Sequence, residues 1–365
     1  MDSGLVKKTS DLTSSFKAVA VKRGYYEDEF IDAFVETTNH SPLMNILHTI
    51  RTNSLRLVLD KFVSQFPRER VQLVNLGVGF DTISFYALKN YENVVCFDTD
   101  FPDQMRTKSN IIAGNDIFRT LLPDLKMVDN FVMSERYKIV PYDLADPTGF
   151  NNLIEAGLSS EFPTLYFAEF VFMYVKSEFV NEVIERLYSF SSADSVIVVS
   201  EFVSLPTEIT NFYSKLLKCA GVTAFGPYEY PNIKSQIQRY SRRWNVKLVC
   251  YSEFYNLNTS EEEKKRIKSL EKFEKMRELG ALCSHIYITL LYKNTIPTVI
   301  SLFNVENYDY TLRNDYDIPY GLEYDYNTEV DLDCFYHLDL GNTNLDEIFS
   351  SNSSSSFLNQ FNVSA

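Results

Sequence analysis

A run of apolar residues that ends in a glycine turn, at residues 71–82, constrains the fold of this chain most. Its first six residues, 71–76, favour a buried strand, and Gly77 and Gly79 follow directly. Asp81 then opens a stretch with helical spacing. A buried strand, a glycine turn and a helix N-terminus in this order are typical of an α/β sheet that binds a nucleotide-like ligand.

A second apolar run follows at 94–97 and ends in Asp98 and Asp100. A carboxylate at the end of the second strand can accept hydrogen bonds from ribose hydroxyls. Thr82 replaces the third glycine of the dinucleotide motif, and the chain has no Gly-Lys-Ser/Thr phosphate loop. The pattern therefore favours S-adenosylmethionine (AdoMet), which has a ribose but no phosphate.

Strand-like and helix-like stretches alternate along the chain as far as residue 293. Strands are predicted at 71–76, 93–98, 136–141, 163–168, 194–201, 245–251 and 284–292, and helical patterns at 42–66, 81–88, 102–115, 148–157, 177–190, 207–220, 231–242 and 261–280. Such alternation predicts a mostly parallel sheet with helices on both faces.

The composition changes after residue 293. Residues 296–365 carry a charge of −11 out of the formal net charge of −14. The sequence predicts a flexible N-terminus at 1–16 and a folded domain at 17–293. It predicts a largely disordered acidic, Tyr/Asp/Ser-rich tail at 294–365. The alternative is a tail that folds over the core or binds a basic partner. The acidic charge argues against a nucleic-acid partner, and no apolar run reaches the ~20 residues of a membrane span.

The cysteines and histidines show no metal-binding or catalytic spacing. They are Cys96, Cys219, Cys250, Cys283, Cys334, His40, His48, His285 and His337. We therefore expect no metal site. An odd number of cysteines without a secretory signal favours a reducing, cytoplasmic location.

Further polar residues stand at predicted strand ends. Asp143, followed by Leu144, comes after the third predicted strand, and Glu169 comes after the fourth. Ligands of open α/β sheets bind outside the carboxyl ends of the strands. We therefore expect Asp143 and Glu169 to meet Gly77 and Asp100 in one crevice, with Asp143 near the adenine amine and Asp100 near the ribose.

Seven motifs occur in order over residues 12–293. They are Ala20-Val-Lys-Arg-Gly24-Tyr25-Tyr26-x-Asp28; Pro42-x-x-Asn45 with Arg51; Asn75-Leu76-Gly77-x-Gly79-x-Asp81-Thr82; Asp100-Phe101-Pro102; Asp143-Leu144; Ala168-Glu169-x-x-x-x-Tyr174; and Arg266-Ile-x-Ser269-Leu270-Glu271. Together they resemble the leucine carboxyl methyltransferase family, AdoMet-dependent enzymes that methylate the C-terminal leucine of the protein phosphatase 2A catalytic subunit. The resemblance implies a Rossmann-like class I methyltransferase fold with a seven-stranded sheet.

The resemblance also implies roles for individual residues. The cofactor-binding set is Lys17, Arg51, Gly77, Asp100, Asp143, Leu144 and Glu169. Arg51 and a basic residue near Lys17 would bind the methionine carboxylate, for which a guanidinium suits well. Glu169 would bind the amino-acid part of the ligand. Without the family, Arg51 on a solvated helix face and Glu169 as a helix cap are the alternatives.

The substrate would supply the nucleophile. A C-terminal carboxylate is ionised near neutral pH, so no catalytic acid or base is expected. Tyr174 and Glu201 are candidates on the substrate side, and Phe170 would help to wall the pocket. The implied partner is the C-terminal tail of the phosphatase 2A catalytic subunit, with no nucleic acid and no membrane, and the chain is expected to be a monomer.

Two stretches depart from the family pattern. Ile46-Leu-His48 replaces an Arg-Gly-Tyr-type stretch, and 206–211 replaces a Gly-Asp-Arg-Phe-Gly-like segment. Two alternatives therefore stay open. One is an O-methyltransferase with another carboxyl substrate, RNA-linked or a small molecule. The other is a catalytically silent paralogue that binds phosphatase.

Overall fold

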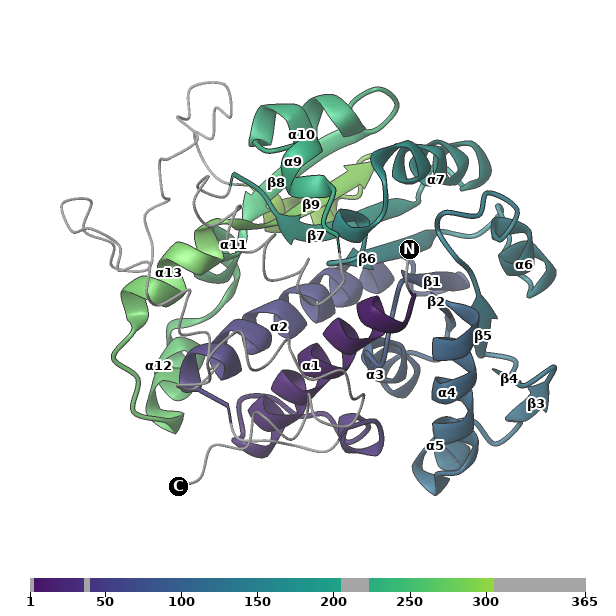
Figure 1. Cartoon of the computed structure of the whole chain (residues 1–365), viewed down its shortest axis with the longest axis horizontal. Helices are drawn as coiled ribbons and strands as arrows, with labels where there is room; N and C mark the ends of the chain where they lie inside the picture. The colour runs from purple at the N-terminus through teal and green to yellow at the C-terminus, as the bar shows by residue number, and fades with distance from the viewer. Residues whose placement is uncertain (1–2, 36–39, 205–222, 305–365) are drawn as a thin grey trace.

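The computed structural model describes residues 3–35, 40–204 and 223–304 (Figure 1). At its centre lies one sheet in the order β3-β4-β5-β2-β1-β6-β7-β9-β8. The strands are β1 (Val71–Leu76), β2 (Val94–Asp100), β3 (Lys126–Val128), β4 (Phe131–Met133), β5 (Tyr137–Pro141), β6 (Thr164–Glu169), β7 (Val196–Phe202), β8 (Asn245–Cys250) and β9 (Ile286–Tyr292). The sheet is doubly wound, because the strand order reverses between β1 and β6.

Helices surround this sheet. They are α1 (Ser3–Lys22), α2 (Pro42–Gln65), α3 (Ile83–Asn90), α4 (Pro102–Ala113), α5 (Asp116–Leu121), α6 (Phe150–Glu155), α7 (Ser177–Phe190), α9 (Gly226–Glu229), α10 (Ile233–Tyr240), α11 (Tyr251–Asn258), α12 (Glu261–Leu270), α13 (Met276–Ser284) and α14 (Pro297–Ile300), with single 3₁₀ turns at η1 (Ile31–Ala33), η2 (Phe172–Tyr174) and η3 (Ser301–Phe303). The helix expected at 207–220 lies outside the described residues.

All seven predicted strands are present. Five of them, β5, β2, β1, β6 and β7, are parallel, and β9 runs antiparallel between β7 and β8. The structure adds a short hairpin, β3–β4, at one edge of the sheet, so the sheet has nine strands instead of seven. Three-residue strands are too short to show a period. The turn residues Asp129 and Asn130, both with positive φ, are the only local signal for the hairpin.

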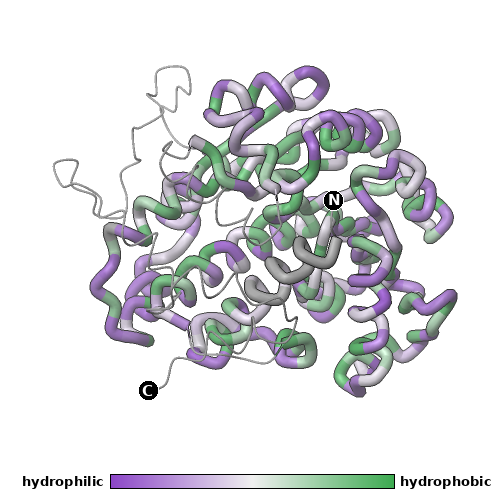
Figure 2. Tube along the Cα trace, viewed as in Figure 1, coloured by the Kyte–Doolittle hydropathy of each residue, from purple (hydrophilic) through white to green (hydrophobic). Residues whose placement is uncertain are grey.

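Each face of the sheet carries its own core. Along β1, Leu73 packs into one cluster and Val74 into the other, as the two-residue period of a strand requires. Figure 2 shows hydrophobic residues along the central strands and mixed colours on the flanking helices. In the described ranges, no helix combines the length and apolar character that crossing a membrane requires.

The N-terminal segment differs from the prediction. The sequence predicts a flexible stretch at 1–16, whereas the structure has helix α1 from Ser3 onward, packed along α2. Ser14, Ser15 and Ala18 are buried in this packing. Small side chains let two helices approach closely, and such a face carries little hydrophobic signal in the sequence.

The C-terminal boundary also differs. The sequence places the end of the domain at residue 293, but α14 and η3 continue the fold to Asn304. Ile296, Val299 and Phe303 are 2 %, 0 % and 1 % exposed, and the rings of Phe303 and Phe254 lie 5.6 Å apart. The tail beyond residue 304 lies outside the described residues.

The helix predicted at 261–280 is two helices. Ser260 caps α12, as predicted, by accepting a hydrogen bond from the Glu263 backbone at 3.2 Å. The chain leaves the helix at Glu271, whose carboxylate accepts hydrogen bonds from Tyr25 at 3.0 Å and Asn45 at 2.8 Å. These contacts with the N-terminal helices occupy the side chain at which α12 ends.

Candidate functional site

The candidate site lies at the carboxyl ends of β1, β2 and β6. The strand order reverses between β1 and β6, and a crevice opens at such a point. Leu76 pairs with Thr99, and Asn75 pairs with Phe167. These registers bring the glycine turn after β1 beside Asp100 and Glu169.

The glycine turn is tight on both sides. Gly77 and Gly79 have φ values of +66° and +53°, which glycine adopts without strain. A Cβ on Gly77 would lie 2.3 Å from Val171, and one on Gly79 would lie 1.9 Å from Ser10 of α1. Any side chain at either position would therefore displace its neighbours.

Asp100 supports this turn. Its Oδ2 accepts a hydrogen bond from the Gly79 backbone at 2.8 Å, and its Oδ1 accepts one from the Phe101 backbone at 2.7 Å. Asp98, two residues earlier, is fully buried and bonds to Lys108 at 2.7 Å and Ser84 at 2.6 Å. Asp98 is therefore a core residue, whereas Asp100 lies at the crevice.

Asp143 and Leu144 follow β5 on the other side of Asp100. The backbone N–H of Tyr142 donates to the Asp100 carbonyl at 2.9 Å, so the two strand ends stay together. Asp143 is partly exposed and accepts a hydrogen bond from the Ala145 backbone at 2.9 Å. Leu144 is buried in the core below. The structure thus brings Asp143 and Asp100 together, as expected.

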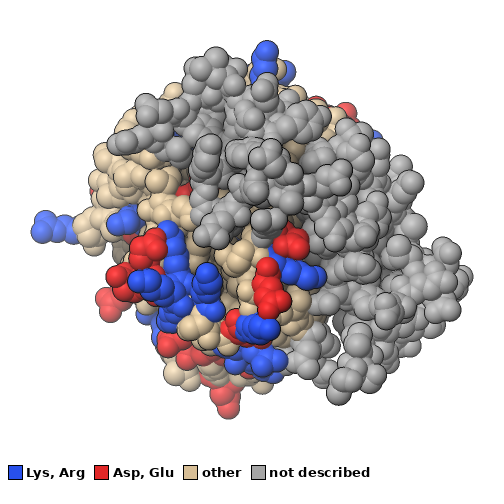
Figure 3. Space-filling view, turned by 90° about the vertical axis from the view of Figure 1, so that its left-hand side faces the viewer, with Lys and Arg blue, Asp and Glu red and all other residues tan. Residues whose placement is uncertain are grey.

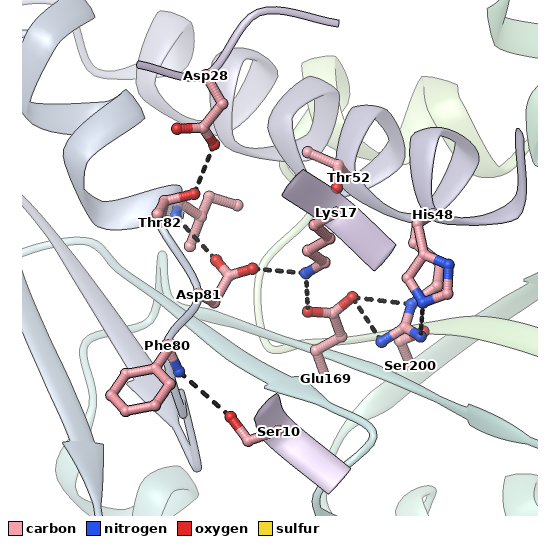
Figure 4. Close-up of polar contacts among 12 residues, drawn as sticks. Ser10, Lys17, Asp28, His48, Thr52, Phe80, Asp81, Thr82, Glu169 and Ser200 are labelled. Atoms are coloured by element: carbon pink, nitrogen blue, oxygen red, sulfur yellow. Dashed lines mark hydrogen bonds and ion pairs between the residues drawn. The ribbon is translucent and has the colours of Figure 1, made fainter. Parts of the chain in front are cut away.

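An ion-pair chain crosses the site between α1, α2 and the strand ends. Lys17 Nζ lies 2.5 Å from Asp81 Oδ2 and 2.9 Å from Glu169 Oε2 (Figure 4). Arg51 donates from Nε to Glu169 Oε1 at 3.1 Å, and its Nη2 lies 3.1 Å from the same oxygen. Two cations therefore alternate with two carboxylates, and the set is neutral overall.

Burial and ion pairing together determine the protonation states of Lys17 and Asp81 in this ion-pair chain. Burial opposes the charge of Lys17, but Asp81 and Glu169 outweigh it and raise the pKa of Lys17. Burial likewise opposes the charge of Asp81, and Lys17 outweighs it, so the pKa of Asp81 is lowered. Lys17 and Asp81 are thus held in their charged forms.

Arg51 has two further contacts. Its Nη1 lies 3.2 Å from His48 Nε2, and its guanidinium carbon lies 4.2 Å from the centre of the Phe170 ring. His48 Nδ1 lies 2.9 Å from the Met44 carbonyl, so Nδ1 carries the proton and Nε2 accepts from Arg51. Burial and the nearby Arg51 lower the pKa of His48 well below its usual value.

Sequence reasoning underestimated Asp81 and His48. The cap-like role of Asp81 is present, because its Oδ1 accepts a hydrogen bond from the Ile83 backbone at 2.8 Å. Its other oxygen holds Lys17, which no local pattern announces. His48 entered only as a departure from a family motif. Its spacing of three residues from Arg51 on one helix was the available signal.

The substrate-side candidates come from two elements in contact, Tyr174 from η2 and Glu201 from β7. Tyr174 packs with Met173 and Ala224, and Phe170 and Phe202 border this group. Glu201 follows Ser200 on β7, so the two side chains point to opposite faces of the sheet. Ser200 contacts Tyr251 at 2.6 Å, whereas Glu201 accepts a hydrogen bond from Tyr240 at 3.0 Å.

The separate sequence motifs contact one another. Asp28 accepts a hydrogen bond from Thr82 at 2.5 Å, which ties the first motif to the glycine turn (Figure 4). Arg266 donates to the carbonyls of Gly24 and Tyr25 at 2.8 Å and 2.6 Å. These contacts hold α1 and α2, and with them the basic residues of the site, over the crevice.

This architecture defines a class of protein. Numbered along the chain, the seven main strands have the order 3-2-1-4-5-7-6, with the last strand antiparallel. That order, the glycine turn after the first strand and the acid after the second define a class I AdoMet-dependent methyltransferase. The residues fit the ligand, because a neutral set of two cations and two carboxylates can offer partners to both the carboxylate and the ammonium of an amino acid.

Residues 13–188 match the family model of leucine carboxyl methyltransferase. The chain is 24 % identical to the leucine carboxyl methyltransferase 1 homolog of Arabidopsis thaliana over 78 % of this chain and 88 % of that protein. It is 26 % identical to leucine carboxyl methyltransferase 1 of Yarrowia lipolytica over 77 % of this chain and 94 % of that protein. The resemblance to the leucine carboxyl methyltransferase family is confirmed by this family model and by these relatives.

A second group of relatives has a similar sequence identity to this chain. The chain is 28 % identical to tRNA wybutosine-synthesizing protein 4 of Candida albicans over 68 % of this chain. It spans only 38 % of that relative's length. Similarity alone therefore does not choose between the two kinds of relative.

Proposed function

We propose that this chain transfers the methyl group of AdoMet to the α-carboxylate of a C-terminal leucine, that of the protein phosphatase 2A catalytic subunit, and forms a methyl ester. The ion-pair chain Asp81–Lys17–Glu169–Arg51 carries the proposal. It supplies charged partners for an amino-acid ligand beside the carboxyl ends of β1 and β6.

Each residue of the predicted site has a role in this proposal. Lys17 and Arg51 bind the ligand carboxylate, and Glu169 binds its ammonium group. Asp100 and Gly77 form the ribose end, and Asp143 with Leu144 forms the adenine end. When bound, AdoMet supplies an electrophilic methyl group.

The acceptor carboxylate needs no general base, since it is already ionised. The protein's task is then to orient the acceptor and to exclude water, because anion and cation neutralise each other along the reaction path. Phe170, stacked on Arg51, and Tyr174 supply apolar walls for this purpose.

The second candidate is methylation of a carboxylate attached to tRNA, which the wybutosine-synthesizing relatives suggest. Charge does not favour tRNA, because the formal net charge is −14, with −11 in residues 296–365 and −3 in the rest of the chain. Figure 3 shows blue and red side chains interspersed on the face of α12 and α13. Pairs such as Lys264–Glu261 at 2.7 Å and Arg266–Glu263 at 2.6 Å lie there, and such a mixed surface does not favour a phosphate backbone.

Methyl transfer from labelled AdoMet tests the proposal. A peptide that ends in free leucine should become methylated, and the same peptide with an amidated C-terminus should not. Transfer to tRNA that carries a carboxylated base, without transfer to the peptide, would favour the second candidate. AdoMet binding without transfer to either acceptor would identify a silent paralogue.

A further inference from the structure

A polar cluster that the cofactor site does not use lies at the end of β7. It consists of Glu201 from β7 and Gln236 and Arg239 from α10, and we call it the β7 cluster. These side chains are 2 %, 1 % and 6 % exposed. One face of α10 therefore presents an amide and a guanidinium to a buried carboxylate.

One part of each side chain is held in place. Arg239 Nε donates to Asn181 of α7 at 3.2 Å. Glu201 Oε1 accepts a hydrogen bond from Tyr240 at 3.0 Å, and Gln236 Nε2 donates to the Tyr230 carbonyl at 3.3 Å. These bonds fix the orientation of the cluster.

Among the described residues, the remaining polar atoms of these side chains have no hydrogen-bond partner, although the Arg239 guanidinium stacks on the Tyr230 ring at 4.3 Å. In the part of the chain that the structure describes, no hydrogen bond reaches Glu201 Oε2, Gln236 Oε1, or Nη1 and Nη2 of Arg239. Burial raises the pKa of Glu201, while the charge of Arg239 and side-chain hydrogen bonds from Tyr240 and Gln236 lower it in part. Unpaired buried polar groups are costly, so this arrangement indicates a ligand that pairs with them.

The cluster adjoins the expected acceptor side. A Cβ on Gly226 would lie 3.0 Å from Met173 Cα and 3.7 Å from Glu201 Oε2, so Gly226 is next to both Met173 and Glu201. The backbone N–H of Phe170 donates at 2.7 Å to Ser200, the residue before Glu201. A chain that enters beside Tyr174 would therefore pass the cluster.

The unpaired atoms include both donors and acceptors. Arg239 offers two N–H groups in one plane, which suit carbonyl or carboxylate oxygens. Gln236 and Glu201 offer oxygens, which suit backbone N–H groups. A polypeptide presents carbonyls and N–H groups in alternation, whereas a phosphate would meet Arg239 but be repelled by the Glu201 carboxylate.

We propose that the β7 cluster binds the backbone of the acceptor polypeptide just before the methylated residue. Arg239 donates to its carbonyl oxygens, and Gln236 and Glu201 accept from its N–H groups. The inference rests on the proposed function, because it requires a polypeptide acceptor.

The test uses the full chain and a peptide ending in free leucine, with Arg239→Met, Arg239→Lys and the control Arg243→Met. Arg243 lies close by but is half exposed and pairs with Glu185 at 3.3 Å. Both Arg239 variants should raise the KM for peptide, and the peptide Kd measured calorimetrically without AdoMet, by about 10-fold or more, as for lost hydrogen bonds to a charged group. AdoMet affinity should stay within about 2-fold, and Arg243→Met should resemble the wild type in every measurement.

Other results would overturn the inference. It is wrong if the wild type methylates the peptide and both Arg239 variants keep its KM and Kd. It is also wrong if Arg239→Lys weakens AdoMet and peptide equally, because Arg239 would then be structural. If Arg239→Met does not fold, Arg239→Lys decides, since lysine keeps the charge. A wild type that methylates only tRNA would refute the proposed function itself, a result visible before any variant is made.

Discussion

Arg51 donates a hydrogen bond from Nη1 to Nε2 of His48 across 3.2 Å. The imidazole can accept this bond only while it is neutral, because its Nδ1–H already faces the Met44 carbonyl at 2.9 Å. A protonated His48 would turn a donor toward a donor. The orientation of Arg51 over Phe170 therefore depends on the protonation state of His48.

Stability should fall in acid because of His48. Its pKa is well below the usual 6.5 in the folded chain, because of burial and Arg51. Below about pH 6.5 the unfolded chain takes up a proton that the folded chain does not, so the free energy of unfolding falls by up to about 1.4 kcal/mol per pH unit. Urea unfolding between about pH 7.5 and 5.5 should show a smaller loss for His48→Gln than for the wild type. Parallel pH profiles would remove His48 from this role.

Arg51→Lys should abolish most activity with little change in stability. Lysine keeps the charge but cannot contact Glu169, His48 and the Phe170 ring together, as Arg51 does. Misplacement of a reactant by about 1 Å can cost ~10²-fold in rate. Single-turnover methylation of a free-leucine peptide, beside a thermal melt, measures both effects.

Arg106→Lys is the matched control for this variant. Arg106 is half exposed and pairs with Asp103 at 2.7 Å on the surface of α4. Its replacement should leave both turnover and melting unchanged. Near-wild-type turnover of Arg51→Lys would separate Arg51 from the chemistry, and a stability loss that explains the whole activity loss would make it structural.

Asp100→Ala should mainly weaken AdoMet binding, whereas Asp98→Ala should mainly lower stability. Asp100→Ala should weaken AdoMet binding by roughly 1.5–3 kcal/mol, the scale of a lost hydrogen bond to a charged group. Asp98→Ala should instead cost about 3–5 kcal/mol of stability, because the buried Lys108 loses its carboxylate partner and keeps only the Asp81 carbonyl. Calorimetry with AdoMet and urea unfolding separate the two. Unchanged AdoMet affinity in a folded Asp100→Ala protein would show that the wrong carboxylate was assigned.

Truncation after Lys293 should destabilise the fold, whereas truncation after Asn304 should not. The shorter chain loses Ile296, Val299 and Phe303, which are buried against the domain. Burial of such side chains contributes about 1.5–3 kcal/mol each, so a loss of about 4 kcal/mol or more is expected. Thermal melts of both truncations give the comparison. Equal melting temperatures would mean that α14 and η3 contribute nothing to the domain.

The sheet was predictable because its strands are short, apolar and separated by helical patterns. All seven main strands follow that signal. Because the strands that carry them are parallel, Gly77, Asp100, Asp143 and Glu169 lie at the carboxyl ends of the strands, on the same side of the sheet. The hairpin β3–β4 was missed because its strands are too short to show a period. The first part of helix α1 was missed because Ser14 and Ser15, which it buries, carry little hydrophobic signal.

Side-chain partnerships were the part that the sequence could not predict. Lys17 and Asp81 are 64 residues apart, and Lys17 and Glu169 are 152 apart, so no local spacing links them. The family resemblance supplied Lys17 and Glu169 as binding residues. It did not reveal that Asp81 contacts Lys17 and His48 contacts Arg51, or that buried atoms of Arg239 and Glu201 lack hydrogen-bond partners among the described residues.

The contacts that hold α1 and α2 over the crevice also set when the site can form. Tyr25 and Asn45 reach Glu271 across 246 and 226 residues of chain. Closing such long loops is a slow, late event in folding. During synthesis, the nascent chain therefore carries Lys17 and Arg51 long before their supports exist. Competence to bind a ligand should appear only after Glu271 has been synthesised, and ligand binding would report on folding of the whole domain in a way that helix content cannot.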